Sequence, residues 1–471
     1  MRDASVVIKM EECAAFGAHF LHRRFMTASP TMPAALTSAL AAPRAKTHKS
    51  ASVARLVGID FARFLAILGM MCAHLLPQSG MPGHVERLGF VTDGNASTLF
   101  AVIGGISVVL ATRRYLEAGL YAAAAWAMAA RGVLVIVIGA SLAMLPISAV
   151  IVLVYFGVAM LCTIPFLRMR SKWLLVIAAG LAIVGPFANA LLRNSLEVMN
   201  EGGGLPWLMW GDPLAALRAT FITGNYPVIT WLVYLLVGMA FARILLAVRS
   251  DPEAQRGFIL RAGALGFTLA AFSIGLSRLV FELGGRDAIL RAAPGIDAEL
   301  VNQLVSMPGM GSPSTIDWWW MLGAAPHTGT PLDILRGVGI ALLVIALMLG
   351  FARVAPRWLL TALRPVSAAG AAPLTIYTVH VLGLAITTTL LMLLGPESFT
   401  ELPWWYLSGA ILALQLAVVL IIGAALAVLG SRGPLEALIS FVAKKAARLG
   451  MRSGVVAAGA REAVQPQRTE S

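Results

Sequence analysis

Residues 55–84 constrain this chain most, because they join a membrane-length helix to ionisable side chains. The core of the segment, LVGIDFARFLAILGMMCAHLL, holds about 21 residues, enough to cross a bilayer as a helix. It nevertheless carries Asp60, Arg63 and His74. A charge near the centre of a membrane helix costs about 2.5–3.5 kcal/mol on insertion scales, so such residues are usually paired or functional. We therefore expect this helix to contribute to function as well as to span the membrane.

The three ionisable residues share one side of that helix. At about 100° per residue, Arg63 falls about 60° from Asp60, and His74 falls about 40° from it. At a rise of about 1.5 Å per residue, Asp60 and His74 lie roughly 20 Å apart along the axis. The pattern predicts an ion pair near one membrane surface and an imidazole near the other. A purely structural i,i+3 pair is an equal alternative for Asp60 and Arg63.

The composition is that of a membrane protein. Of 471 residues, 59% are hydrophobic and only 13% are charged, whereas soluble domains average about 25% charged residues. Most of the net charge of +13 lies in short loops and tails, which is typical of membrane orientation and not of nucleic-acid binding. The three cysteines are scattered, without metal-ligand spacing, so we expect neither a metal site nor a disulfide framework.

We expect an all-α, polytopic transmembrane bundle of about 10 helices, with an eleventh, re-entrant piece near 201–220 as an alternative. Lys and Arg concentrate in alternate loops, which places both termini in the cytoplasm and the protein in the cell membrane. Residues 1–54 are expected to form a disordered tail. Residues 431–471 are expected to form a basic tail whose amphipathic stretch lies on the inner membrane surface. The expected spans are 57–77, 95–112, 131–146, 148–167, 173–193, 226–248, 258–281, 333–351, 370–394 and 405–429.

Two long loops on the outer side, 194–225 and 282–332, are candidates for ligand binding, since loops of that length are usually functional or disordered. Trp318 in the second loop belongs either to an aromatic belt or to a stacking platform for a sugar or lipid headgroup. His327 precedes Asp333 near the start of an expected span, and His380 falls near mid-membrane. A lone histidine there is as consistent with hydrogen-bonded packing as with proton transfer.

Two pairs of opposite charge stand at expected helix ends, and small residues mark one helix for close packing. Asp333 with Arg336, and Arg278 with Glu282, are most simply interfacial ion pairs. The expected second helix carries Gly104 and Gly105 among other small residues, and this pattern predicts close helix contact.

The polar residues in these helices suit acyl transfer. A histidine can act as general base or as transient nucleophile on an acyl group. Arg63, Arg113 and Arg114 on the inner side are candidates to hold the phosphates of an acyl-CoA, together with Asp60. A role as topology anchors is the simpler interpretation of Arg113 and Arg114.

One family resembles this chain in several motifs. The opening Arg55-Leu-Val-Gly-Ile-Asp60-Phe-Ala-Arg63 resembles the Arg-x-x-x-Ile/Val-Asp-x-x-Arg-Gly opening of the heparan-α-glucosaminide N-acetyltransferase family and of YeiB-like membrane proteins, with Phe64 in place of the glycine. The resemblance covers roughly 55–430, divided into an acetyltransferase-like half, 55–250, and a YeiB-like half, 251–430. Further similar stretches are STLFAVIGGIS (97–107), TGNYPVITWLVYLLVGMAFAR (223–243), PHTGTPLDILRGVGIA (326–341) and PLTIYTVH (373–380).

The resemblance implies acetyl transfer from cytosolic acetyl-CoA, as co-substrate, to an amino sugar across the membrane. The family uses a histidine after the first helix, with an asparagine about eleven residues earlier. His84 stands near that histidine's place and His74 near the asparagine's. Both are candidate catalytic residues. His74 ranks first because its helix fixes it.

Two function classes follow. The first is a membrane acyltransferase that moves an acyl group from acyl-CoA to an outward-facing sugar, lipid or metabolite, with Trp318, His327, Asp333 and His380 as candidate substrate contacts. The second is a transporter without covalent chemistry, which intramembrane charges suit equally well. The expected partners are the lipid bilayer, a small-molecule or glycan acceptor and a second copy of the chain in a homodimer, with no tightly bound cofactor and no nucleic acid.

Overall fold

The structure is a computed structural model that describes residues 49–77, 92–196, 201–313, 317–399 and 401–464. Residues 51–471 form one structural unit, in which the described residues contain helices and turns but no strand. The α-helices are α2 (Lys49–Leu75), α4 (Asn95–Glu117), α5 (Tyr121–Leu142), α6 (Leu153–Cys162), α7 (Ser171–Asn194), α8 (Pro213–Arg218), α9 (Val228–Ala247), α10 (Pro252–Val280), α11 (Arg286–Ala292), α12 (Ala298–Ser306), α13 (Pro331–Val354), α14 (Arg357–Ala362), α15 (Arg364–Ala371), α16 (Pro373–Leu393), α17 (Gly409–Leu429) and α18 (Pro434–Val464). Short 3₁₀ or π turns are η1 (Ile164–Phe166), η2 (Trp207–Gly211), η3 (Ala219–Thr223), η4 (Phe281–Gly285), η5 (Trp318–Leu322) and η6 (Pro396–Phe399).

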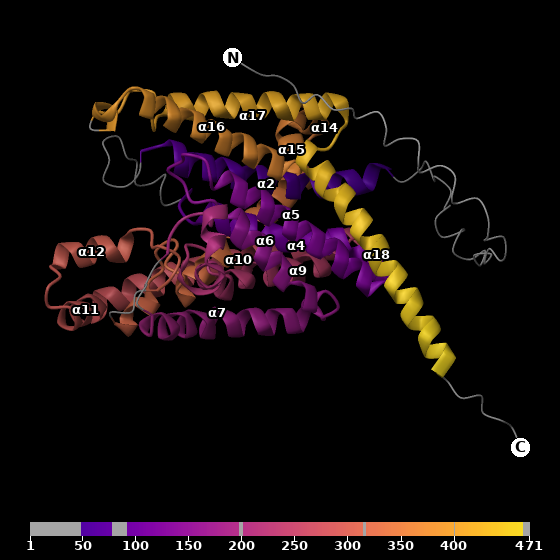
Figure 1. Ribbon diagram of the computed structural model, residues 1–471, viewed down its shortest axis with the longest axis horizontal. Coiled ribbons are helices and arrows are strands. Elements are labelled where there is room, and N and C mark those ends of the chain that lie inside the picture. Colours follow the sequence, from indigo (N-terminus) through magenta and orange to yellow (C-terminus); the bar gives the residue numbers. More distant parts are fainter. Residues whose placement is uncertain (1–48, 78–91, 197–200, 314–316, 400, 465–471) are drawn as a thin grey trace, which may run out of the picture. The chain divides into compact units, whose positions relative to one another are not determined.

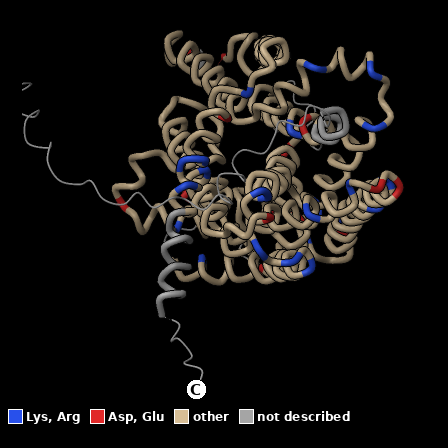
Figure 2. The backbone as a smooth tube through the Cα atoms, turned by 90° about the vertical axis from the view of Figure 1, so that its right-hand side faces the viewer, with Lys and Arg blue, Asp and Glu red and all other residues tan. Residues whose placement is uncertain are grey.

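Nine of the described helical stretches are long and apolar enough to span a membrane, which confirms a polytopic helical bundle. The long helices run side by side (Figure 1), with α17 along one edge and α7 along another. Lys, Arg, Asp and Glu occur only as isolated bands on a largely uncharged backbone (Figure 2). So few charged residues along the helices suit a hydrocarbon environment, where every backbone polar group must be satisfied within the helix.

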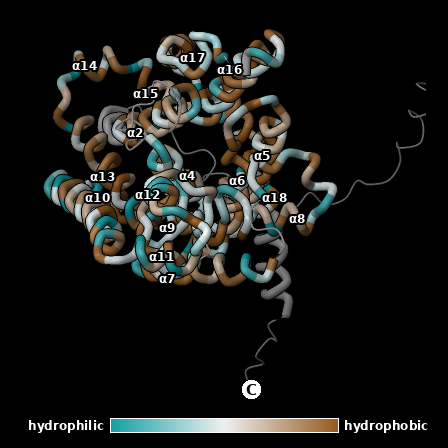
Figure 3. Tube along the Cα trace, turned by 90° about the vertical axis from the view of Figure 1, so that its left-hand side faces the viewer, coloured by the Kyte–Doolittle hydropathy of each residue, from teal (hydrophilic) through white to brown (hydrophobic). Residues whose placement is uncertain are grey.

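The helices differ in how deeply they are buried. The best-buried spans are α4 and α9, with 83% and 78% of their apolar windows inside the protein. The most apolar span, α17, has only 17% of its window buried. Both α17 and α10 lie at the edges of the bundle (Figure 3). Their exposed apolar side chains are therefore expected to face lipid.

Two glycines allow the central helices α4 and α9 to touch. A Cβ on Gly105 would collide with the carbonyl of Leu235, and a Cβ on Gly238 would collide with the carbonyl of Val102. Because neither glycine has a side chain, the two backbones approach directly, as small residues permit in membrane helices. The close-packing role predicted for Gly105 is therefore confirmed.

One expected span, 148–167, differs from the prediction. It contains only the ten-residue helix α6, followed by η1. Pro165 lies at the start of η1 and disfavours helix at the residue before it, so α6 ends early. The chain still runs antiparallel to α5, since Gly139 packs against Leu153 and Gly132 packs against Leu161.

Three other expected boundaries also move. Helix α5 begins at Tyr121, before the predicted start at residue 131, so Arg131 lies in its interior. Helix α2 begins at Lys49, inside the predicted tail, while residues 1–48 lie outside the described residues. The loop piece predicted near 201–220 contains η2 and α8, both far shorter than a membrane span. A helix can continue past a charge that its neighbours accommodate, as α5 does past Arg131.

The C-terminal helix α18 is attached to two other helices. Its Glu436 accepts hydrogen bonds from the backbone N–H groups of Leu374 (2.7 Å) and Thr375 (3.1 Å), at the start of α16. A carboxylate there satisfies N–H groups that have no partner inside the helix. Further along, Ala443 and Ala447 pack on α5. The predicted amphipathic stretch is therefore a helix, and part of its apolar face covers protein.

Candidate functional site

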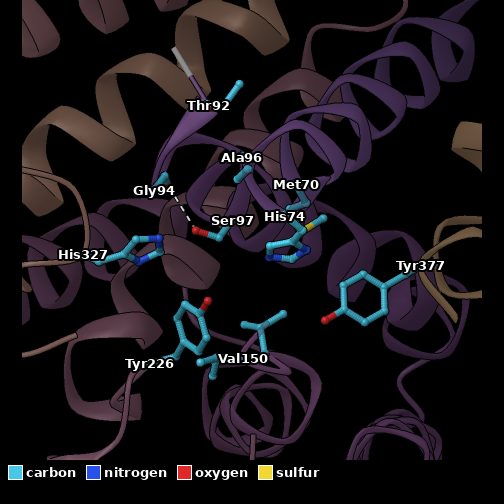
Figure 4. Close-up of a pocket in the computed structure, with 12 residues that line it drawn as sticks. Met70, His74, Thr92, Gly94, Ala96, Ser97, Val150, Tyr226, His327 and Tyr377 are labelled. Carbon is cyan, nitrogen blue, oxygen red and sulfur yellow. Dashed lines mark hydrogen bonds between the residues drawn. The ribbon is translucent and has the colours of Figure 1, made fainter. Parts of the chain in front are cut away.

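His74 lies at one end of α2, beside a pocket formed by residues from distant parts of the chain (Figure 4). We call this the histidine pocket, and its space is about 350 Å³ including the open mouth. The His74 end of α2 and the first turn of α4 form one side of it. The pocket is lined by Met70, Ala73, His74, Thr92, Gly94, Ala96, Ser97, Val150, Val152, Tyr226, His327 and Tyr377.

Two polar residues stand behind His74. Its Nδ1 lies 3.1 Å from Nε2 of His380, and the two rings are parallel, with centroids 5.4 Å apart. The Nδ1 of His380 lies 2.7 Å from Oε1 of Gln415 in α17. His380 is only 1% exposed, so no bulk water competes for these bonds. Gln415, His380 and His74 thus form one hydrogen-bonded row that ends at the pocket.

The row fixes which nitrogen of His74 is free. An amide oxygen only accepts, so Nδ1 of His380 carries the proton and its Nε2 is an acceptor. His74 must then donate from Nδ1, which leaves the lone pair on its Nε2 unused by the row. A neutral imidazole with a free nitrogen is the form needed by a general base or a nucleophile. His380 orients His74 in the way that the carboxylate of a Ser-His-Asp triad orients its histidine, although the residues differ.

Across the pocket stand His327 and Tyr226, with ring centroids 5.6 Å apart in an edge-to-face arrangement. His327 belongs to the loop before α13 and has a φ of 57°, so its backbone adopts the left-handed region. The backbone N–H of Gly311 donates to the His327 carbonyl at 2.6 Å and holds the loop in place. Burial, together with the nearby positive charge of Arg336, lowers the pKa of His327 to about 4. Burial also raises the pKa of Tyr226 to about 12. Both side chains are therefore neutral near pH 7.

Helix α4 presents its first turn to this pocket. The backbone N–H groups of a first turn have no acceptor four residues earlier and carry the positive end of the helix dipole. Gly94 precedes the helix with a φ of 68°, and Ala96 and Ser97 line the pocket. A pocket wall of this kind favours negative charge developing on a reacting oxygen.

The predicted pair Asp60–Arg63 forms near the start of the membrane-length part of α2, Val57–Leu75. Arg63 Nη1 lies 2.6 Å from Asp60 Oδ1, and Arg63 Nη2 donates to Ser107 of α4 at 3.0 Å. Both side chains are largely buried, at 14% and 16% exposed. The pair therefore faces α4, whereas His74 faces α16, and both groups point into the protein.

Two further arginines were candidates for holding acyl-CoA. Arg113 pairs with Glu117 at 2.5 Å, and the Arg114 guanidinium lies 4.6 Å from the ring centre of Tyr115. Both stand at the end of α4 that is remote from the histidine pocket, as predicted. The Arg113 side chain is 30% exposed and Arg114 is exposed, so both arginines are accessible to a ligand.

The remaining candidates are divided between the pocket and its surroundings. Asp333 is buried, pairs with Arg336 at 3.0 Å and shares a second, smaller cavity with His327. Trp318 stacks on Phe187, with ring centroids 5.7 Å apart, and does not line the histidine pocket. His84 lies outside the described residues. The structure thus brings His74, His380 and His327 together and places Trp318 apart.

One predicted ion pair is wrong. Glu282 pairs with Arg286 at 2.7 Å and not with Arg278. A Glu placed four residues before a basic residue agrees with the helix dipole better than the reverse order, which explains the choice. Arg278 is left beside a different cavity.

Gln415 and Tyr226 were not predicted as site residues. Gln415 is the one uncharged amide within the apolar run GAILALQLAVVL of α17. A polar side chain in such a run requires a partner, and that signal was available from the sequence. Tyr226 stands in a loop, where no periodicity indicates which way a side chain points.

The fold and the pocket together define a class: a multi-pass membrane protein with a hydrogen-bonded histidine beside a pocket at one end of its helices. Residues 55–267 match the family model described as heparan-alpha-glucosaminide N-acetyltransferase, catalytic. The match agrees with the predicted resemblance over these residues, and the similarity indicates a transferase of the membrane acetyltransferase type. The match covers just under half of the chain and ends within α10. A search of curated proteins finds no match.

Proposed function

We propose that this protein transfers an acetyl group from acetyl-CoA to an amino or hydroxyl group of an acceptor bound in the histidine pocket. The observation that carries the proposal is the row Gln415–His380–His74, which ends in a free imidazole nitrogen inside the pocket. The family match of residues 55–267 supports acetyl transfer as the reaction.

The donor is proposed to enter at the end of the membrane span Val57–Leu75 that carries Asp60 and Arg63. Arg63, Arg113 and Arg114 supply guanidinium groups there, which bind phosphate oxygens well. His74 lies roughly 20 Å away along the helix, so the pantetheine arm would extend between the helices to bring the thioester to it. The acceptor would enter at the opposite end.

In the first step, Nε2 of His74 attacks the thioester carbonyl carbon. The N–C bond forms, the C–S bond breaks and coenzyme A leaves as a thiolate. The proton on Nδ1 of His74 moves to Nε2 of His380 along the existing hydrogen bond, so the acetylated imidazole stays neutral. The first turn of α4 stabilises the oxyanion of the tetrahedral intermediate.

In the second step, the acceptor nitrogen or oxygen attacks the acetyl carbon. The bond to Nε2 breaks, its electron pair returns to the imidazole, and His380 returns its proton to Nδ1 of His74. The proton lost by the acceptor is taken up by the thiolate through solvent. The products are the acetylated acceptor and coenzyme A.

The test measures coenzyme A release by the purified protein in vesicles, with acetyl-CoA on one side and an amino sugar on the other. His74→Ala is expected to abolish release, because it removes the attacking nitrogen. Its melting temperature and elution profile should match those of the unsubstituted protein. Unchanged release by the folded His74→Ala variant would remove the assignment.

A further inference from the structure

Another pocket, distinct from the histidine pocket and from the smaller cavity shared by His327 and Asp333, lies outside the segment that matches the family. It is formed by α10, the start of α11, α12 and the loop before α13, and its space is about 810 Å³ including the mouth. It is larger than the histidine pocket, and Pro326, next to His327, lines its wall. The full lining is Ile274, Ser277, Arg278, Phe281, Arg286, Asn302, Val305, Ser306, Ala324, Ala325, Pro326 and Arg336.

Three arginines line this pocket, and no Asp or Glu does. Arg286 pairs with the exposed Glu282, and Arg336 pairs with the buried Asp333. Arg278 has no ion-pair partner among the described residues. The pocket therefore carries positive charge that no Asp or Glu among the described residues compensates at Arg278.

Two of the arginines also have unused donors. The Nε–H groups of Arg286 and Arg336 are buried and have no acceptor among the described residues. The Arg336 side chain is only 3% exposed. A buried donor without an acceptor costs about 1–3 kcal/mol, more for a charged group, so such groups are normally satisfied. An anion in the pocket would satisfy them.

The surroundings indicate where the anion comes from. Leu279 and Leu283, on either side of the pocket residue Phe281, are 54% and 77% exposed, and α10 lies at the edge of the bundle (Figure 3). Ile274, Phe281 and Val305 add apolar wall inside the pocket. Arginines beside an apolar helix face suit the phosphate of a lipid whose chains lie along that helix.

We propose that this pocket binds the phosphate group of a membrane lipid, with Arg278, Arg286 and Arg336 as its donors. Phospholipid headgroups and lipid-linked sugar phosphates share this chemistry. The site does not depend on the proposed acetyl transfer. Pro326 lines this pocket and the next residue, His327, lines the histidine pocket. A phosphate bound here would therefore place the group attached to it beside the histidine pocket.

The test uses the full-length protein in detergent, titrated with phosphatidylglycerol, with a polyprenyl monophosphate and with uncharged diacylglycerol, and read by native mass spectrometry. Both phosphate lipids are expected to be retained in preference to diacylglycerol, and the more tightly held one identifies the source. Arg278→Gln should weaken phosphate-lipid binding about tenfold, as expected for one lost hydrogen bond to a charged group. Arg278 is exposed at the pocket, so the change should not prevent folding.

Arg261→Gln is the matched control, since Arg261 is an exposed arginine on the same helix, far from the pocket. It is expected to bind both phosphate lipids as the unsubstituted protein does. Equal binding by Arg278→Gln and Arg261→Gln would overturn the proposal, and so would equal retention of diacylglycerol.

Discussion

Gln415→Leu tests the hydrogen-bonded row behind His74 without changing the pocket lining, because Gln415 is not among the residues that line the pocket. Leucine has a similar size but cannot accept a hydrogen bond. The variant leaves Nδ1–H of His380, 1% exposed, without the acceptor that lies 2.7 Å away. His380 is then expected to move its proton to Nε2, and His74 must accept at Nδ1 and hold its own proton on Nε2. The nitrogen needed for attack would be blocked.

The size of the effect follows from the cost of the unpaired donor. A buried donor without a partner costs about 1–3 kcal/mol. A penalty of that size changes the ratio of the two tautomers by about 5-fold to 150-fold. We therefore expect coenzyme A release to fall by about one to two orders of magnitude, with little change in the KM for acetyl-CoA.

A second assay reads the same change without any substrate. Diethyl pyrocarbonate modifies the unprotonated nitrogen of a neutral imidazole, and mass spectrometry locates the product. Modification of His74 should slow in Gln415→Leu in parallel with coenzyme A release. Gln415→Glu keeps an acceptor and should retain most of the rate.

Two results would refute this reasoning. One is a Gln415→Leu variant that releases coenzyme A at the unsubstituted rate. The other is a Gln415→Glu variant as impaired as Gln415→Leu, since that would show that packing over Gly383, which Gln415 contacts closely, matters more than the acceptor.

Two predictions concern stability. Gly105→Ala should destabilise the protein by about 1–3 kcal/mol, because the new methyl group meets the Leu235 carbonyl. Thermal melting in detergent measures this change, with Gly180→Ala as the control, because a Cβ at Gly180 meets nothing within 4 Å. Equal melting temperatures for the two variants would contradict the prediction. The second concerns pH. His327 has a pKa of about 4 in the folded protein and about 6.5 when unfolded, so the unfolded chain binds more protons between these values. Stability should be complete above about pH 6.5 and fall by up to about 3 kcal/mol towards pH 4. His327→Asn, which tolerates the left-handed backbone, should melt with a weaker dependence on acid pH, and an unchanged dependence would rule His327 out.

Much of the fold was predictable because a bilayer imposes length and apolarity on each span. The helix that carries Asp60 and His74, the ion pair to Arg63 and the close packing of Gly105 all follow from rules that act within one helix. The shortening of α6 was less accessible. Apolar runs look alike whether they form ten helical residues or twenty, and Pro165 was the only local sign.

The site was predictable only in part, because its residues meet across the chain. His74 and His380 are 306 positions apart, and no periodicity connects them. Each was identified alone, as an ionisable group inside a membrane helix, and their contact depends on how α2 packs against α16. Gln415 is uncharged, so the cost of burying a charge, which indicated the others, did not indicate it.

His74 and the residues that hydrogen-bond behind it come from two different stretches of the chain. His74 belongs to the part that matches the acetyltransferase family, whereas His380 and Gln415 come from beyond residue 267. A protein shortened at that boundary would keep the proposed nucleophile and lose the two residues that set its protonation. Substitutions at His380 or Gln415 would therefore change the protonation of His74, so these three positions are expected to change together.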